Sequence, residues 1–208
     1  MSERRGRGRP KETDTDTSAL IARSALLRFA AQGYDATTLR EIAGDARVDV
    51  ALVAYRFGGK EGLWKAVVTQ AAEHLQSALG AIEAEGSPTQ RLREAMRAFL
   101  AYLLERPEVP RLLLRDVTID SDRSQWLLNE LSSPLHSHFY DLARAAAADC
   151  SPSGTSHLQF RVANFIYAAA STVARRDRLV QLVDGIADDA AFAAALEATL
   201  VDGALRCE

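Results

Sequence analysis

The clearest structural signal in this sequence lies in residues 37–63, where the chain reads TTLREIAGDARVDVALVAYRFGGKEGL. Thr38 and Glu41 have the spacing of a capping box, in which the threonine oxygen accepts a backbone N–H and the glutamate reaches back to the cap. Apolar residues follow at helical spacing, and Asp49 is a favourable N-cap for a second helix. A glycine pair beginning at Gly58 ends that helix, because glycine enters the left-handed conformation at little cost. The stretch predicts two short helices joined by a tight turn.

Two short helices joined in this way fit two different structures. One is a helix-turn-helix, whose second helix lies in the major groove of DNA. The other is a structural αα-hairpin that has no nucleic-acid partner. The caps and the apolar spacing are the same in both, so the pattern alone leaves both open.

The residues around this turn resemble the TetR family of bacterial transcriptional regulators (AcrR/TetR-like). The resemblance runs without a gap over about residues 18–68. It is carried in order by residues 33–38 (GYDATT), 41–43 (EIA) and 55–63 (YRFGGKEGL). It implies a DNA-binding regulator that acts as a homodimer and responds to a small molecule. The rest of the chain is similar to the family only in length and helical character.

Helical periodicity and helix breakers predict an all-α chain of about nine helices. The expected helices cover residues 18–32, 38–46, 50–57, 60–85, 89–105, 111–117, 125–149, 157–176 and 189–205. Thr17 or Ser18 is expected to cap the first helix, and Pro134 to disturb the long helix that contains it. With the resemblance, this pattern predicts three regions: a disordered basic arm at 1–14, a three-helix DNA-binding domain at 15–75 with its helix-turn-helix at 38–57, and a helical ligand-binding and dimerisation domain at 76–208.

Charge is distributed unevenly along the chain. The net charge of −3 combines +3 over residues 1–65, which hold 12 Lys+Arg and 9 Asp+Glu, with −6 over residues 66–208. A basic N-terminal region followed by an acidic remainder suits a polyanionic partner that binds the N-terminal region only. The arm itself is either a solvated tail without a function or a segment that follows phosphates and enters a narrow minor groove.

The resemblance assigns DNA contacts to the arm and to the two short helices. The candidate residues are Arg7, Arg9, Lys11, Thr38, Arg40, Val50, Ala51, Leu52, Tyr55, Arg56 and Lys60. The second helix begins with apolar residues, which can meet thymine methyl groups but cannot form bidentate hydrogen bonds with bases. Lys60 is either a phosphate contact or a plain solvated helix start. Arg47 stands where the family usually has glycine, and a positive φ there would cost on the order of 1 kcal/mol.

The sequence gives no indication of a membrane protein, a secreted protein, a metal-binding protein or an enzyme. The longest weakly polar run, residues 162–174, is too short to span a bilayer, and no apolar segment follows the N-terminal arginines, so we expect a cytoplasmic protein without a signal peptide. The cysteines, Cys150 and Cys207, lack metal-ligand spacing, and two free thiols are expected. His136 and His138 are two residues apart and therefore point away from each other on a helix. We expect no enzyme activity, no cofactor and no metal.

The C-terminal body is expected to bind a small molecule and a second copy of the chain. Candidate ligand-lining residues are Phe99, Tyr102, Leu103, Arg115, Trp126, Phe139, Phe165 and Tyr167, a mostly apolar set that favours a hydrophobic or aromatic effector. The last two amphipathic helices predict a homodimer through a four-helix bundle, with packing inside one chain as the alternative. The expected function is a repressor released from a palindromic double-stranded DNA operator by its effector. The alternative is a dimeric sensor or interaction module with weak or lost specific DNA binding.

Overall fold

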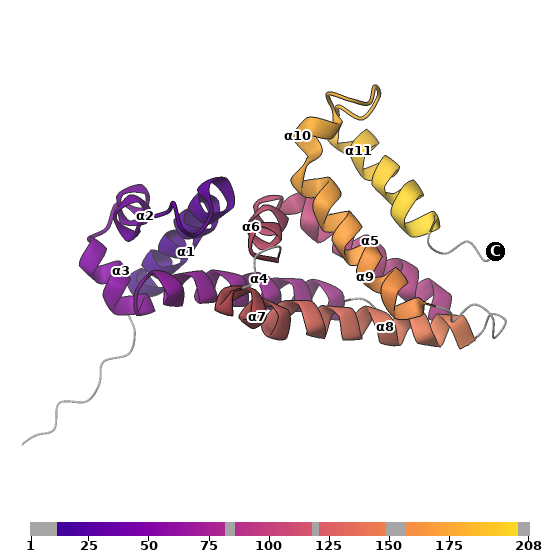
Figure 1. Ribbon diagram of the computed structural model, residues 1–208, viewed down its shortest axis with the longest axis horizontal. Coiled ribbons are helices and arrows are strands. Elements are labelled where there is room, and N and C mark those ends of the chain that lie inside the picture. Colours follow the sequence, from indigo (N-terminus) through magenta and orange to yellow (C-terminus); the bar gives the residue numbers. More distant parts are fainter. Residues whose placement is uncertain (1–11, 82–85, 118–120, 149–156, 204–208) are drawn as a thin grey trace, which may run out of the picture. The chain divides into compact units, whose positions relative to one another are not determined.

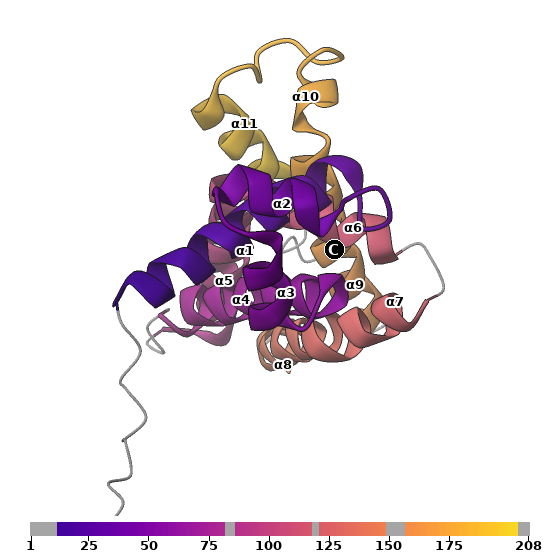
Figure 2. The ribbon, with the colours of Figure 1, turned by 90° about the vertical axis from the view of Figure 1, so that its left-hand side faces the viewer.

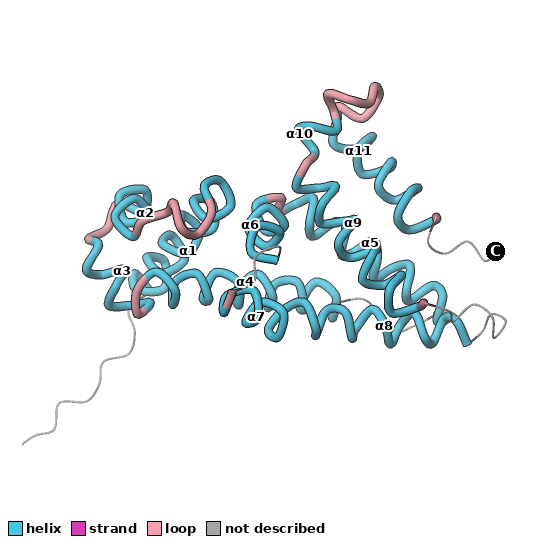
Figure 3. Tube along the Cα trace, viewed as in Figure 1, coloured by secondary structure: helices cyan, strands magenta, loops and turns pink. Residues whose placement is uncertain are grey.

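The computed structural model describes residues 12–81, 86–117, 121–148 and 157–203, and every regular element in these ranges is a helix (Figure 3). The all-α expectation is therefore confirmed. The arm residues Arg7, Arg9 and Lys11 and the two cysteines lie outside the described ranges. The chain divides into two compact units between Val67 and Val68. We call them the N-terminal unit and the C-terminal unit.

The N-terminal unit contains three helices and the beginning of a fourth (Figures 1 and 2). The helices are α1 (Glu12–Gln32), α2 (Leu39–Ala46), α3 (Val50–Phe57) and α4 (Lys60–Gly80). Helix α1 packs against α2, and α2 packs against α3. The two short helices lie within one residue of their predicted bounds.

Helix α1 begins earlier than the sequence led us to expect. A cap at Thr17 or Ser18 was predicted, but the helix already includes both residues and starts at Glu12. Threonine, serine and aspartate in a helix interior each cost less than about 0.7 kcal/mol relative to alanine. A run of them therefore does not stop a helix. The predicted cap was wrong.

The core of the N-terminal unit is apolar and partly aromatic. Phe29, Ile42, Val53 and Trp64 are each fully buried, with 0% of their surface exposed. The ring of Tyr34 stacks on Phe29 at 5.7 Å between centroids and meets the edge of Trp64 at 6.4 Å. These side chains come from all four helices and from the α1–α2 loop, so they fix the position of the short helices.

The C-terminal unit begins with the later part of α4 and ends with α11 and a short π-helix. Its further helices are α5 (Pro88–Glu105), α6 (Glu108–Val117), α7 (Asp122–Leu127), α8 (Ser133–Ala148), α9 (Leu158–Ala174), α10 (Arg176–Leu179) and α11 (Asp189–Leu196). Helices α5, α8 and α9 pack against one another (Figure 1), and α6 packs on α9. No described helix has both the length and the apolar character that a membrane crossing requires.

The long helix predicted over residues 125–149 is divided in the structure. A π-helical segment, Leu128–Ser132, stands between α7 and α8, and the Ser133 N–H donates to the Leu128 carbonyl five residues earlier. Pro134 has no N–H, and its ring would collide with the carbonyl four residues before it in a regular α-helix. The wider π turn before the proline avoids that collision. The predicted irregularity is therefore present, but it precedes the proline.

The last helix also changes its hydrogen bonding. Helix α11 ends at Leu196, and a π-helical segment covers Glu197–Asp202. The Thr199 hydroxyl donates to the Ala195 carbonyl at 2.7 Å, a side-chain bond that competes with the backbone ladder. The Arg97 side chain on α5 forms an ion pair with Glu197, which ties this segment to the unit.

Three phenylalanines form the centre of the C-terminal core. Phe99 on α5, Phe139 on α8 and Phe165 on α9 lie with their ring centroids 5.5–5.9 Å apart, in edge-on and tilted pairs. Such pairs add about 0.5–1.5 kcal/mol each beyond the burial of their surface. The three rings therefore hold the three packed helices together.

Candidate nucleic-acid interface and ligand cavity

Helix α2 begins with the capping box that the sequence predicts. The Thr38 hydroxyl accepts a hydrogen bond from the Glu41 N–H at 3.3 Å, and the Thr38 N–H donates to the Glu41 carboxylate at 2.8 Å. Asp49 caps α3 by accepting from the Ala51 N–H at 2.6 Å, and Gly58 ends it with φ 71°. These local bonds determine where each short helix starts and stops.

The turn between α2 and α3 places an arginine in the left-handed conformation. Arg47 has φ 56° and ψ 43°. Its N–H donates to the Gly44 carbonyl at 3.2 Å, and the Val48 N–H donates to the Ala43 carbonyl at 2.9 Å. This is a Schellman motif, in which the left-handed position favours glycine. Arg47 therefore has the positive φ for which the sequence analysis expected an energetic cost.

Replacing Arg47 with glycine should stabilise the protein. Removing the Cβ relieves about 1 kcal/mol of strain, part of which is offset by the greater freedom of glycine in the unfolded chain. We expect the free energy of unfolding to rise by up to about 1 kcal/mol, measured by urea denaturation at fixed protein concentration. The matched control is Arg47→Ala, which removes the charge but keeps the Cβ. Equal unfolding midpoints for the two variants would mean that the turn is not strained.

The outward face of α3 is exposed and mostly apolar. Tyr55 is 88% exposed and Val50 is 39% exposed. Ala51 and Ala54 are exposed beside them, and Leu52 is half-buried. Ala54 was not among the predicted contacts, although its place four residues after Val50 puts it on the same face. Val53 faces the core.

The remaining predicted contacts come from α2, the end of α3 and the start of α4. Arg40 on α2 is exposed. The Arg56 guanidinium is half-buried and donates to the Ser18 hydroxyl on α1 at 2.5 Å. The Lys60 ammonium donates to the Asp35 carbonyl at 3.2 Å and lies 4.4 Å from the centre of the Tyr34 ring. Lys60 thus braces the loop before α2.

An ion-pair cluster joins α1 to α2. The Arg28 guanidinium donates to Asp45 at 2.5 and 2.9 Å and to Glu41 at 3.3 Å. The hydrogen bond from Arg28 lowers the pKa of Asp45, and hydrogen bonds from Thr38 lower the pKa of Glu41. The cluster holds α2 against α1.

This cluster predicts a loss of stability in acid. Because the pKa values of Asp45 and Glu41 are lower in the folded state, the unfolded state binds protons more readily, and stability rises with pH in that range. The contribution is complete above the ordinary values of 3.8 and 4.5, and it is lost as pH falls through the lowered folded values. We expect Asp45→Asn to flatten a plot of unfolding free energy against pH below about 4.5. Asp141→Asn, which removes a carboxylate from the C-terminal unit, is the control, and an equal flattening would contradict the assignment.

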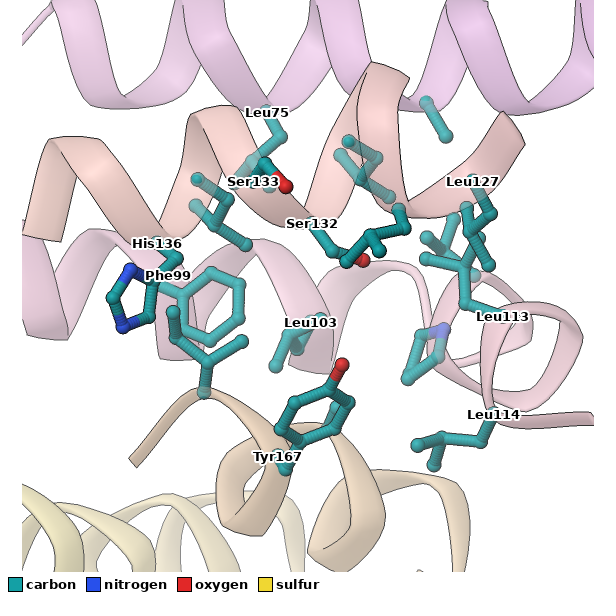
Figure 4. Close-up of a pocket in the computed structure, with 18 of the residues that line it drawn as sticks. Leu75, Phe99, Leu103, Leu113, Leu114, Leu127, Ser132, Ser133, His136 and Tyr167 are labelled. Atoms are coloured by element: carbon teal, nitrogen blue, oxygen red, sulfur yellow. The ribbon is translucent and has the colours of Figure 1, made fainter. Parts of the chain in front are cut away.

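A partly open cavity of about 460 Å³ lies between helices of the C-terminal unit (Figure 4). It is lined by eight leucines and other apolar side chains, with polar groups from three serines, two tyrosines and one histidine. None of the lining residues is an aspartate, glutamate, lysine or arginine. A cavity of this size and character fits a small, largely apolar molecule.

The predicted ligand residues separate into two groups. Phe99, Tyr102, Leu103 and Tyr167 line the cavity, whereas Arg115, Trp126, Phe139 and Phe165 are not among its lining residues. Phe139 and Phe165 are instead core residues, 1% and 7% exposed. The Tyr102 hydroxyl donates to the Ala71 carbonyl at 2.8 Å, and burial raises its pKa to about 12.

Most of the cavity wall was not identified from the sequence. It comes from α6, from the end of α7 and from the π-helical segment with the start of α8. These residues include Leu113, Leu114, Leu127, Ser132, Ser133 and His136 (Figure 4). The apolar run at residues 112–114 was the signal that could have pointed to α6. Among the described residues, no group of three or more histidine, cysteine, aspartate or glutamate side chains could hold a metal ion.

Comparison with known proteins identifies the N-terminal unit. Residues 21–67 match the family model described as "Bacterial regulatory proteins, tetR family". The chain is 34% identical over 109 residues to the "Probable HTH-type transcriptional regulator YttP" of Bacillus subtilis, covering 50% of this chain and 52% of that protein. It is also 34% identical over 99 residues to the "HTH-type transcriptional regulatory protein RaaS" of Mycobacterium tuberculosis, covering 45% and 46%. The matched region thus spans about half the length of each curated relative.

The fold of the whole chain is similar to that of solved regulators. A bacterial regulatory protein of the tetR family from Rhodococcus RHA1 aligns with a TM-score of 0.70 at 19% identity, covering 92% of this chain and 98% of that one. A TetR-like transcriptional regulator from Rhodococcus sp. RHA1 aligns with a TM-score of 0.68 at 18% identity, covering 94% and 98%. The predicted resemblance to the TetR family of bacterial regulatory proteins is confirmed: the family model matches residues 21–67, and the whole chain shares the fold of solved TetR-like regulators.

Proposed function

We propose that this protein is a transcriptional regulator that binds an operator through α2 and α3 and is released by a small hydrophobic or aromatic molecule. The observation that carries the proposal is the helix-turn-helix itself. Its caps and Schellman turn hold α3 with one face outward, and this geometry lies within the region that matches the family model. A repressor is the expected mode, because a ligand that prefers the non-binding conformation lowers DNA occupancy.

Phosphate contacts supply most of the affinity in this proposal. Thr38 sits at the N-terminus of α2, where a phosphate oxygen meets the positive end of the helix dipole. Arg40 is exposed on the same helix and can neutralise a neighbouring phosphate. The arm residues Arg7, Arg9 and Lys11 would add contacts along the backbone or in the minor groove.

The DNA-binding part of the proposal is tested by salt dependence. Binding to labelled DNA, selected from a random duplex pool, is measured by fluorescence anisotropy at several salt concentrations. Arg40→Ala should weaken binding to all sequences and reduce the slope of log K against log salt by about one. Lys60→Ala should act in the same direction, but Lys60 also braces Asp35, so Arg40 gives the cleaner result.

The matched control for Arg40 is Arg144→Ala. It removes one positive charge from an exposed position in the C-terminal unit, where the side chain pairs with Asp141 at 3.3 Å. Its salt slope should equal that of the unaltered protein. If the protein showed no salt-sensitive, sequence-specific binding to any selected duplex, the alternative of a sensor without specific DNA recognition would be favoured.

We further propose that the protein acts as a homodimer through α9 and α11. Phe160 on α9 is 72% exposed, and Tyr167, seven residues later on the same face, is 41% exposed. Large apolar side chains on one helix face favour burial against a second copy. Phe160→Glu should therefore shift the protein from dimer to monomer in sedimentation, whereas Leu182→Glu, on the loop before α11, is the control for an exposed apolar residue. An unchanged dimer would contradict this interface.

The cavity of the C-terminal unit is the proposed effector site. The neutral fluorophore 1-aminoanthracene serves as the probe, because no charged side chain lines the cavity. Ala163→Phe places a ring in the cavity and should abolish probe binding, whereas Ala101→Phe, at an exposed position of α5 outside the lining, should not. Equal probe affinity for both variants would place the site elsewhere.

A further inference from the structure

The outward face of α3 offers very few hydrogen-bonding groups. Residues 50–57 read VALVAYRF, so Tyr55 and Arg56 carry the helix's only polar side chains. Val50, Ala51 and Ala54 present methyl groups to the outside, and Tyr55 projects at 88% exposure. A recognition helix that reads bases by bidentate hydrogen bonds needs arginine, asparagine, glutamine or a similar side chain there.

Arg56 does not supply that chemistry on the outward face. Its guanidinium is half-buried and donates to the Ser18 hydroxyl on α1. On a helix, residue 56 is also rotated by about 100° from Tyr55 and by about 200° from Ala54. The surface that α3 presents is therefore apolar, with the Tyr55 hydroxyl at one side.

Charge beside this surface favours a nucleic acid over an apolar protein partner. Arg40 near the start of α2 and Arg47 in the turn before α3 are both exposed, and exposed arginines suit the phosphates that border a groove. Residues 1–65 carry a net charge of +3 although the whole chain carries −3. An apolar strip bordered by cations matches a major groove into which apolar methyl groups project.

Only one base edge in the major groove carries an apolar group, the C5 methyl of thymine. We propose that α3 selects its operator by thymine methyl groups, packed against Val50, Ala51 and Ala54. A G·C pair facing this strip would offer no methyl group and would leave its donors and acceptors without partners. This inference rests on the proposed DNA-binding function and specifies the class of DNA: half-sites with adjacent thymines where α3 enters the groove.

The experiment begins with the full-length protein and a random duplex pool. Selected half-sites should carry thymines at neighbouring positions, on either strand. Each of these thymines is then replaced by uracil, which removes only the methyl group and keeps base pairing. Loss of one buried methyl group should weaken binding by about fourfold. Uracil placed in the flanking sequence is the control and should leave the affinity unchanged.

A protein variant connects the methyl effect to α3. Val50→Thr keeps the side-chain shape but replaces a methyl group with a hydroxyl, and Val50 is the partly exposed first residue of the helix. In a double-mutant cycle, the uracil effect should shrink in this variant at one thymine and stay unchanged at the others. Ala54→Ser gives a second cycle at a neighbouring thymine, and circular dichroism verifies the helical content of both variants.

The outcomes separate this inference from the function on which it rests. Specific, salt-sensitive binding that is equally tight with thymine and uracil would overturn methyl recognition and leave the DNA-binding proposal intact. Selected sites rich in guanine and cytosine opposite α3 would do the same. The absence of any specific, salt-sensitive binding would overturn both, and would favour an apolar protein partner for the α3 face.

Discussion

Replacing Trp64 with alanine should lower the free energy of unfolding by about 3–5 kcal/mol, because the change removes a fully buried indole from the core of the N-terminal unit. The ring contacts Tyr34 from the α1–α2 loop, and it follows Leu63, which is also fully buried. The remaining structure can collapse around the missing ring only in part. Specific DNA binding should be lost together with stability, since α2 and α3 depend on this core for their position.

Urea denaturation followed by circular dichroism measures the effect at fixed protein concentration. The matched control uses the other tryptophan, since the chain has two. Trp126 on α7 is only half-buried, so Trp126→Ala should cost less than half as much. Equal losses for the two variants would show that Trp64 is not the centre of its core. A Trp64→Phe variant, which keeps an aromatic ring, should recover part of the stability.

Replacing Phe139 with alanine should produce a loss of similar size in the C-terminal unit, about 3–5 kcal/mol. Phe139 is 1% exposed and contacts both Phe99 and Phe165. Its loss would remove both of its pairs with other phenylalanines and leave an apolar void among three helices. Tyr167→Ala, which truncates a cavity-lining ring that is 41% exposed, should cost about 1 kcal/mol.

Probe binding distinguishes the two substitutions further. Tyr167→Ala should reduce the affinity for 1-aminoanthracene at a temperature where the protein remains folded, because Tyr167 lines the cavity. Phe139→Leu, which keeps most of the buried volume, should leave that affinity nearly unchanged. If Phe139→Leu weakened the probe more than Tyr167→Ala, Phe139 would belong to the ligand site after all.

The parts of the structure that the sequence predicted well depend on neighbouring residues. The Thr38 and Asp49 caps and the Gly58 stop each involve bonds within a few positions, and all are present. Features that depend on distant residues were missed. The start of α1 was misplaced because weak helix formers do not end a helix without a competing partner, and the two π-helical segments require a detailed balance of backbone bonds.

The ligand candidates show the same limit. The sequence offered Phe99, Phe139 and Phe165 as candidates for lining a ligand site, and all three are buried in the structure. Helical periodicity indicates which side of a helix faces inward, because an apolar stripe must be buried. It could not distinguish a side chain that meets another helix from one that meets an empty space. That difference depends on how α5, α6, α8 and α9 are spaced, which no short segment encodes. Tyr167 lies only two residues after the buried Phe165 on α9, yet it is partly exposed and lines the cavity.

The π-helical segment before α8 has a consequence for insertions and deletions. A π turn contains one residue more than an α turn, so the Leu128–Ser132 segment is one residue longer than a regular helix would need there. Deleting a single residue there would remove the wide turn that accommodates Pro134, and every side chain on one side of the deletion would turn by about 100° relative to the other. His136 and Leu135 would then leave the cavity wall that they now form. The register of α8 relative to α7, and not only the composition of these helices, thus determines which side chains a ligand would meet.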